Sequence, residues 1–170
     1  MNLEEAIKTA LKFETMVRDT YRDSVDKISD PAGQRVFKTM AEEEQGHIDY
    51  LEAKLAEWRD TGKVTPESLA TMVPSKERID AGVKELKKPL EQAGDRAAEL
   101  ELLKKALAVE VETSNFYQKM VDELPDGERD LFTRFLEIEV GHQTIVQAEI
   151  DNVQGLGFWF DFQEFNLEAG

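Results

Sequence analysis

The segment FKTMAEEEQGH, residues 37–47, returns near the other end of the chain as FTRFLEIEVGH, residues 132–142, and this repetition is the strongest indication of the fold. The glutamates and the glycine-histidine pairs match best: Glu44 aligns with Glu139, and His47 aligns with His142. The chain holds two histidines in all, and both fall at this one repeated position. The sequence therefore contains an internal repeat in which each copy carries a Glu-x-x-His motif.

The repeat extends upstream of both motifs. The segment FETMVRDTY resembles VEVETSNFY, which aligns Glu14 with Glu110 and Tyr21 with Tyr117 at an offset of 96 residues. The offset falls to 95 at the histidine motifs, so one residue is lost between the two matched parts of the second copy. Two helical hairpins of similar design explain this arrangement.

Apolar residues recur at the helical spacing of three and four, and long strand-like alternation is absent. We expect long helices over about 3–28, 32–58, 95–124 and 128–153. Asp30-Pro31 and Pro125-Asp126-Gly127 form short turns, whereas three of the five prolines lie between the second and third helices. The sequence predicts one all-α domain, 1–170, in which hairpins at about 1–60 and 95–153 are joined by a long crossover, about 61–94, that holds one or two short helical pieces.

Composition excludes several classes of function. The chain has 170 residues, no cysteine, and 36 acidic against 21 basic residues, a formal charge of −15. Without cysteine there is no thiolate catalysis, iron–sulfur cluster or thiolate zinc site. The acidic balance argues against nucleic-acid or anionic-membrane partners, and no apolar run of about 20 residues is present to span a bilayer. The N-terminus lacks the pattern of a secretory signal, so we expect a cytoplasmic protein.

The repeated motifs predict a dinuclear metal site. Residues three apart are neighbours on a helix, so each Glu-x-x-His offers a carboxylate and an imidazole to one ion. Four carboxylates buried together are unfavourable unless about two divalent cations compensate their charge. A solvated acidic helix face is the alternative, and the matched repeat argues against it. The predicted metal ligands are Glu14, Glu44, His47, Glu110, Glu139 and His142.

Two further matched pairs accompany the motifs. Tyr21 and Tyr117 lie two helical turns after their glutamates, where they would act at the site by hydrogen-bonding its carboxylates or by supplying an electron. A buried tyrosine with a satisfied hydroxyl is an equal alternative. Gly46 and Gly141 each cost about 1 kcal/mol relative to alanine inside a helix, and close helix approach beside the metals would explain them.

Together these motifs resemble the ferritin-like superfamily, in its rubrerythrin and bacterioferritin branch, over both predicted hairpins. The resemblance implies a ferritin-like four-helix bundle and a non-haem di-iron centre that oxidises ferrous iron with dioxygen or hydrogen peroxide. It implies that Glu44 and Glu139 bridge the ions, that Glu14 and Glu110 are terminal ligands, and that His47 and His142 bind one ion each. The same donors suit manganese or zinc.

The sequence departs from the family at several points. It has no cysteine-rich rubredoxin domain, so electrons would come from an external donor. Thr113 stands where rubrerythrins carry an extra glutamate, and Gln45 stands where bacterioferritins carry the haem methionine, so no haem is expected. A metal-binding or iron-delivery protein with the same dinuclear site and little turnover is the alternative function.

The C-terminal segment GFWFDFQEFNLEAG, the end of a tail from about 154 to 170, holds five of the 14 aromatic residues. We expect it to pack on the bundle as a strap, or else to contact a second subunit, because exposed aromatic clusters mark interfaces. A homo-oligomer, at least a dimer, is expected. Three acidic residues and no basic residue accompany the aromatics, which argues against membrane binding.

Overall fold

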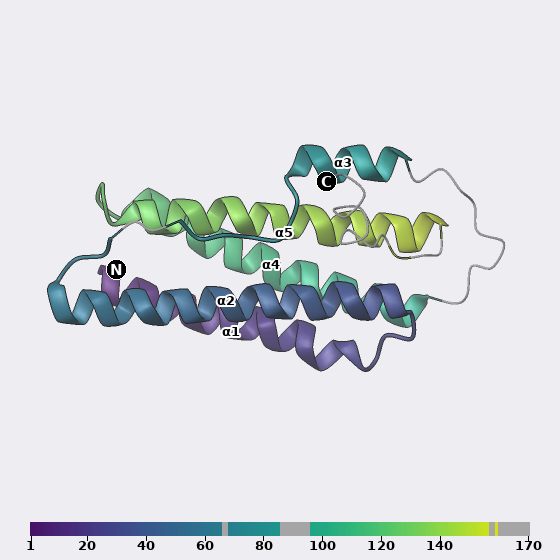
Figure 1. Cartoon of the computed structure of the whole chain (residues 1–170), viewed down its shortest axis with the longest axis horizontal. Helices are drawn as coiled ribbons and strands as arrows, with labels where there is room; N and C mark the ends of the chain where they lie inside the picture. The colour runs from purple at the N-terminus through teal and green to yellow at the C-terminus, as the bar shows by residue number, and fades with distance from the viewer. Residues whose placement is uncertain (66–67, 86–95, 157–158, 160–170) are drawn as a thin grey trace.

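The computed structural model describes residues 1–65, 68–85, 96–156 and 159. Over these ranges the chain forms five helices and no strand (Figure 1). They are α1 (Leu3–Val25), α2 (Pro31–Thr61), α3 (Lys76–Glu85), α4 (Ala97–Glu123) and α5 (Arg129–Leu156). The four long helices expected from the sequence are present, and α3 is a short helix inside the expected crossover.

Local sequence signals set the helix ends. Asn2 forms a capping box with Glu5 at the start of α1, and the Asp30 side chain caps α2 just before Pro31. The expected first helix is too long, because α1 ends at Val25 and Ile28 lies in the turn that follows. Ile28 is 2% exposed, so its apolar side chain reaches the core from the turn. In the sequence it therefore resembles one more residue of the apolar helix face.

The four long helices pack as two antiparallel hairpins, α1 with α2 and α4 with α5, and α1 also packs against α4. Arg96, just before α4, forms an ion pair of 2.9 Å with Asp30 in the α1–α2 turn. At the opposite end, Leu3, Gly62 and Gly127 line one pocket. Helix α4 therefore starts where α2 starts and runs parallel to it, which requires a connection along the length of the bundle (Figure 1).

The crossover is fixed to α2 and α5 by its backbone. Arg134 on α5 donates from Nε and Nη2 to the carbonyl oxygen of Leu69, at 3.2 and 3.0 Å. Helix α3 then packs against α5, where Ile79 is almost fully buried. The connection thus lies against the hairpin that carries Glu139 and His142 (Figure 1).

The apolar core is divided into two clusters along the bundle. One cluster holds Val17 and Met40, and the other holds Ala10 and Leu51. On every long helix the predicted metal ligands lie between the residues of the two clusters. The folded chain therefore places the predicted ligands in a polar layer between two apolar clusters.

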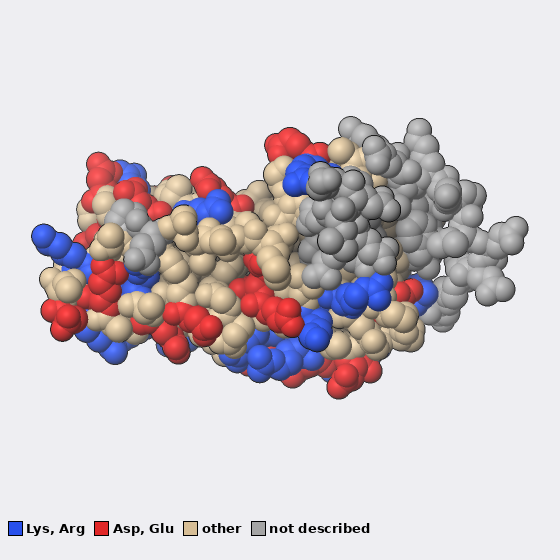
Figure 2. Space-filling view, in the orientation of Figure 1, with Lys and Arg blue, Asp and Glu red and all other residues tan. Residues whose placement is uncertain are grey.

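The outer surface carries charges of both signs. Figure 2 shows acidic and basic side chains interspersed over the visible face of the described residues. Several form ion pairs one helical turn apart, such as Lys8 with Glu4 at 2.8 Å. Among the helices of the described ranges, none combines the length and hydropathy needed to cross a bilayer.

The end of the chain is described up to Leu156 and again at Trp159. Helix α5 continues past Gly155, so the tail begins later than expected. Trp159 is 4% exposed, packs edge-on against Phe37 and donates its indole N–H to Glu99 at 2.7 Å. This contact supports the strap interpretation for Trp159, while the other tail aromatics lie outside the described residues.

Candidate metal centre

All six predicted ligands meet in the polar layer of the bundle. They are Glu14 on α1, Glu44 and His47 on α2, Glu110 on α4, and Glu139 and His142 on α5. Each residue is at most 1% exposed. Four helices thus contribute to one buried cluster, as the repeat predicts.

The six residues form two overlapping groups of four. The first is Glu14, Glu44, His47 and Glu139, and the second is Glu44, Glu110, Glu139 and His142. Within each group, one donor atom from every residue lies within 4.8 Å of the others, close enough to hold one metal ion. Glu44 and Glu139 belong to both groups. A carboxylate has two oxygens, so these two residues could serve two neighbouring ions.

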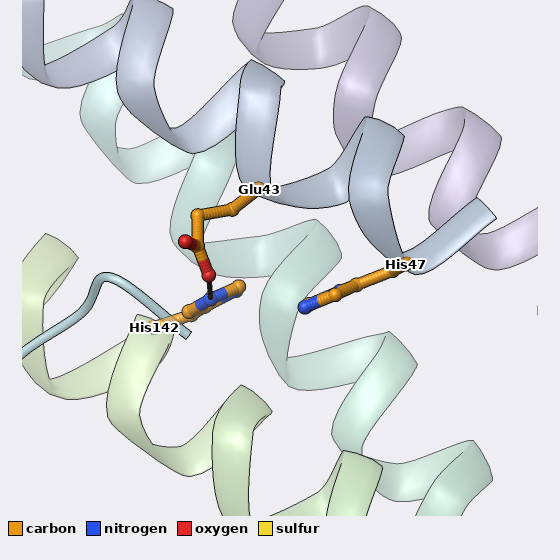
Figure 3. A group of neighbouring side chains, drawn as sticks. All are labelled: Glu43, His47 and His142. Atoms are coloured by element: carbon orange, nitrogen blue, oxygen red, sulfur yellow. Dashed lines mark ion pairs between the residues drawn. The ribbon is translucent and has the colours of Figure 1, made fainter. Parts of the chain in front are cut away.

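Both imidazoles turn Nδ1 toward the carboxylates. His47 Nδ1 lies 3.0 Å from Glu14 Oε2 and 3.0 Å from Glu44 Oε2, and His142 Nδ1 lies 2.8 Å from Glu44 Oε1. The two rings are nearly parallel, with centroids 5.4 Å apart (Figure 3). The site is therefore compact and two-sided, with one histidine on each side of Glu44.

Several buried oxygen and nitrogen atoms of the predicted ligands make no hydrogen bond within the described part of the chain. They include both oxygens of Glu139, Glu110 Oε2 and Nδ1 of His142. The last lies close to Glu44 Oε1, but the two atoms are not aligned as donor and acceptor. Buried polar atoms without partners cost several kcal/mol unless something else satisfies them. Oxygen and imidazole donors aimed at one another in this way fit divalent cations.

The carboxyl groups differ in acidity because their surroundings differ. Burial raises the pKa of Glu14 to about 8, although the charge of His47 opposes this. Burial and the neighbouring carboxylates raise the pKa of Glu139 well above its usual range. Burial also acts to raise the pKa of Glu44, but His142 and His47 outweigh it and hold that pKa well below its usual range. Glu44 is thus the carboxylate at the centre of the site's ion pairs.

The histidines are correspondingly basic. Burial lowers the pKa of His47, but Glu44 and Glu14 outweigh burial and raise it to about 10. Burial likewise opposes ionisation of His142, and Glu44 is the main cause of a pKa well above the usual range. Protons therefore occupy this cluster at neutral pH when no cation compensates the carboxylates.

The two tyrosines cross over between the hairpins. The Tyr21 hydroxyl on α1 donates to Glu110 Oε1 on α4 at 2.5 Å, and the Tyr117 hydroxyl on α4 donates to Glu14 Oε1 on α1. Burial, together with these carboxylates, raises the pKa of both hydroxyls well above the usual range, so both stay protonated. The hydrogen bonds expected from Tyr21 and Tyr117 to carboxylates of the site are present, and they fit a satisfied buried hydroxyl equally well. A role in the chemistry of the site, including supply of an electron, stays a prediction.

The explanation expected for the two helical glycines is wrong. A Cβ on Gly46 would meet no atom within 4 Å, and one on Gly141 would lie 3.7 Å from Val73 Cγ1, an ordinary contact. Neither glycine is required by a close helix approach. A methyl group fits at both positions.

Sequence reasoning missed a buried carboxylate beside the predicted ligands, Glu43. It is 8% exposed, and its Oε2 lies 3.9 Å from His142 Nε2 (Figure 3). Burial acts to raise its pKa, but His142, Met72 and Thr71 outweigh burial and lower it. Glu43 lies one helical turn before His47 on the same face, and this spacing could have identified it from the sequence. The second copy of the repeat has no matching acid, so a search for matched residues did not select Glu43.

Comparison with known proteins gives no relative for this chain. A scan against models of protein families, a search of curated proteins and a search of solved structures each find no match.

Proposed function

We propose that this chain is a ferritin-like, non-haem di-iron protein that oxidises ferrous iron with dioxygen or hydrogen peroxide. The observation that carries the proposal is the pair of buried ligand groups that share Glu44 and Glu139. Two Glu-x-x-His helices and two further glutamate helices form the donor set of di-iron and di-manganese carboxylate bundles.

The chain's own residues would hold the two ions. Glu14 and His47 would bind one ion, Glu110 and His142 would bind the other, and the two shared carboxylates would contact both. Four ionised glutamates carry −4, which two divalent cations balance, and this removes the penalty of burying the carboxylates alone. A bound iron pair would supply one-electron oxidation of each ferrous ion and a place where the oxidant is reduced.

Residues around the donors would keep them in place and exclude water. Tyr21 and Tyr117 donate to one oxygen of Glu110 and of Glu14, which leaves each second oxygen for an ion. Phe135 packs edge-on against the His47 ring and stacks on Tyr117. Fixed ligands in a dry site favour one coordination geometry over others.

Anaerobic titration with ferrous iron, followed by addition of dioxygen or hydrogen peroxide, tests the proposal. We expect saturation at about two ions per chain and rapid oxidation afterwards. Glu139→Ala removes a shared ligand and should abolish metal-dependent oxidation. Glu137→Ala, an exposed position two residues earlier on α5, is the matched control and should behave as the unmodified chain. A natively folded chain that binds no divalent metal would disprove the proposal.

The assay also separates the second candidate, a metal-delivery protein. Such a protein would bind the same two ions through the same six ligands and release them without rapid turnover. Binding of two ions without sustained oxidation by either dioxygen or hydrogen peroxide would favour a delivery protein over an oxidase.

A further inference from the structure

Among the positions that flank the ligands in the repeat, one carries an acid in the first half of the centre and an apolar residue in the second. Glu43 precedes Glu44 on α2, and the corresponding residue before Glu139 on α5 is Ile138. Ile138 is buried, and its side chain has no group that accepts a hydrogen bond. The repeat that matches all six ligands therefore breaks at a residue adjacent to one of them.

The crossover holds the Glu43 carboxylate by both oxygens. The Thr71 hydroxyl donates to Oε2 at 2.7 Å, and the Met72 backbone N–H donates to Oε1 at 2.6 Å. These two donors belong to a segment outside the four ligand-bearing helices. They fix the carboxylate against rotation, so its direction does not depend on α2 alone.

The fixed carboxylate faces Nε2 of His142, the ring nitrogen on the opposite side from Glu44. His142 directs Nδ1 at Glu44, and its Nε2 is buried and makes no hydrogen bond within the described ranges. An imidazole that binds an ion through Nδ1 keeps its proton on Nε2 and needs an acceptor there. Glu43 Oε2 is 3.9 Å away, so a small rotation of the imidazole ring completes the contact (Figure 3).

We propose that Glu43 is a positioning residue that makes the His142 half of the centre bind its ion more tightly than the His47 half. The inference rests on the proposed metal centre and goes beyond it, since the six ligands alone make the halves equivalent. A carboxylate that accepts the outer N–H of a ligating imidazole fixes the tautomer and raises the basicity of the ligand. Loss of such a partner typically weakens metal binding by about 10- to 100-fold.

Stepwise titration of the full chain with Co²⁺ tests this inference. The unmodified chain should bind two ions in two resolved steps. Glu43→Gln should weaken the tighter step by about 10- to 100-fold and leave the weaker step unchanged. Glu43→Ile copies the other half and should merge the steps. Glu42→Gln, the exposed neighbour on α2, is the matched control and should titrate as the unmodified chain.

A second measurement separates positioning from a general structural effect. In the Co²⁺-loaded protein, the exchangeable Nε2 proton of His142 should give a shifted resonance that exchanges faster with solvent in Glu43→Gln. Thr71→Val keeps the carboxylate but removes one of its anchors, so it should weaken the same step to a smaller degree. Equal weakening of both steps, or no change in Glu43→Gln, would overturn the inference.

Two other outcomes are also decisive. Loss of a third equivalent of Co²⁺ in Glu43→Gln would overturn the inference, because Glu43 would then be a ligand of a separate ion with His47 and His142. Failure of the unmodified chain to bind any Co²⁺ would overturn the proposed function and this inference with it. Two bound ions with an unchanged Glu43→Gln titration would overturn only the inference.

Discussion

Each buried tyrosine binds the carboxylate of the opposite hairpin, so one hydroxyl serves both ligand geometry and hairpin packing. Tyr21→Phe would leave Glu110 Oε1 buried without its donor, and Tyr117→Phe would do the same to Glu14 Oε1. We expect each variant to lower the free energy of unfolding of the metal-free protein by about 1–3 kcal/mol, measured by urea denaturation. Metal stoichiometry should not change, since neither hydroxyl is a ligand. An unchanged denaturation midpoint in both variants would contradict these two hydrogen bonds.

The raised pKa values of the ligands predict that metal binding releases protons. Glu14, with a pKa of about 8, and His47, with a pKa of about 10, are both mainly protonated at pH 7 in the metal-free protein. Both must lose the proton to bind an ion, so apparent affinity should rise as pH increases through these values and fall as pH decreases. Calorimetric titration at pH 7 in buffers of different ionisation enthalpy should show release of at least two protons per chain. Proton uptake, or no buffer dependence, would contradict this assignment.

The clustering of the six predicted ligands could be predicted because the repeat selects residues by matched position. A single Glu-x-x-His is weak in so acidic a chain, and agreement between Glu44-x-x-His47 and Glu139-x-x-His142 makes the prediction specific. The same requirement for a matching residue excludes Glu43 from the prediction, because Ile138 stands at the corresponding position in the second copy. The crossed tyrosine contacts were also beyond the sequence, because helical spacing places a residue on a face but does not say which neighbouring helix that face meets.

Helix α2 contains two glycines whose surroundings are opposite. A Cβ on Gly33 would lie 2.4 Å from Trp159 Cε2 and 2.8 Å from Ile28 Cγ2, whereas one on Gly46 would meet nothing within 4 Å. Gly33→Ala should therefore displace Trp159 and destabilise the protein by about 1–3 kcal/mol. Gly46→Ala should stabilise it by up to about 1 kcal/mol, since alanine is the better helix former.

Fluorescence reports the movement of Trp159 directly. The chain has two tryptophans, so both glycine variants are best made in a Trp58→Phe background. Gly33→Ala should shift the emission of Trp159 to longer wavelength as it leaves Phe37 and Glu99, and Gly46→Ala should leave the emission unchanged. Equal emission spectra for the two variants would contradict the close contact at Gly33.

At the level of elements, sequence patterns located the long helices because apolar periodicity persists over six or more turns. They failed where a buried side chain sits outside a helix, as Ile28 does in the α1–α2 turn. The path of the crossover depends on tertiary hydrogen bonds, such as Arg134 to the Leu69 carbonyl, which no local pattern encodes. The bundle was thus predictable, and the connection that reaches Glu43 was not.

For the whole molecule, the formal charge of −15 combines two different populations of acids. Most acidic residues lie on the surface among basic ones (Figure 2), where they contribute little to stability. The four glutamates among the predicted ligands are buried in one layer, and two divalent cations would reduce the formal charge by four units. The stability of the folded chain should therefore depend on metal far more than on surface ion pairs.

This dependence predicts that the effect of one substitution on stability changes sign when metal binds. The raised pKa of Glu139 means that the folded metal-free protein holds a proton that the unfolded chain loses above its ordinary carboxyl pKa, so stability from this group falls as pH rises. Glutamine does not ionise, so Glu139→Gln removes this fall in stability. At pH 7 the metal-free variant should melt at the same temperature as the unmodified chain or at a higher one.

With metal bound, the unmodified chain should melt at a higher temperature than Glu139→Gln. A cation at 100 times its Kd stabilises the unmodified chain by about 2.7 kcal/mol, and the variant, which lacks a shared ligand, should gain much less. Thermal unfolding with Zn²⁺ and with a chelator measures both states, and Glu137→Gln, an exposed site on α5, should follow the unmodified chain in each. A variant that melts below the unmodified chain in chelator, or gains equally from Zn²⁺, would show that Glu139 does not couple metal binding to folding. The inversion distinguishes buried ligands from a buried structural network, because the latter loses stability under both conditions.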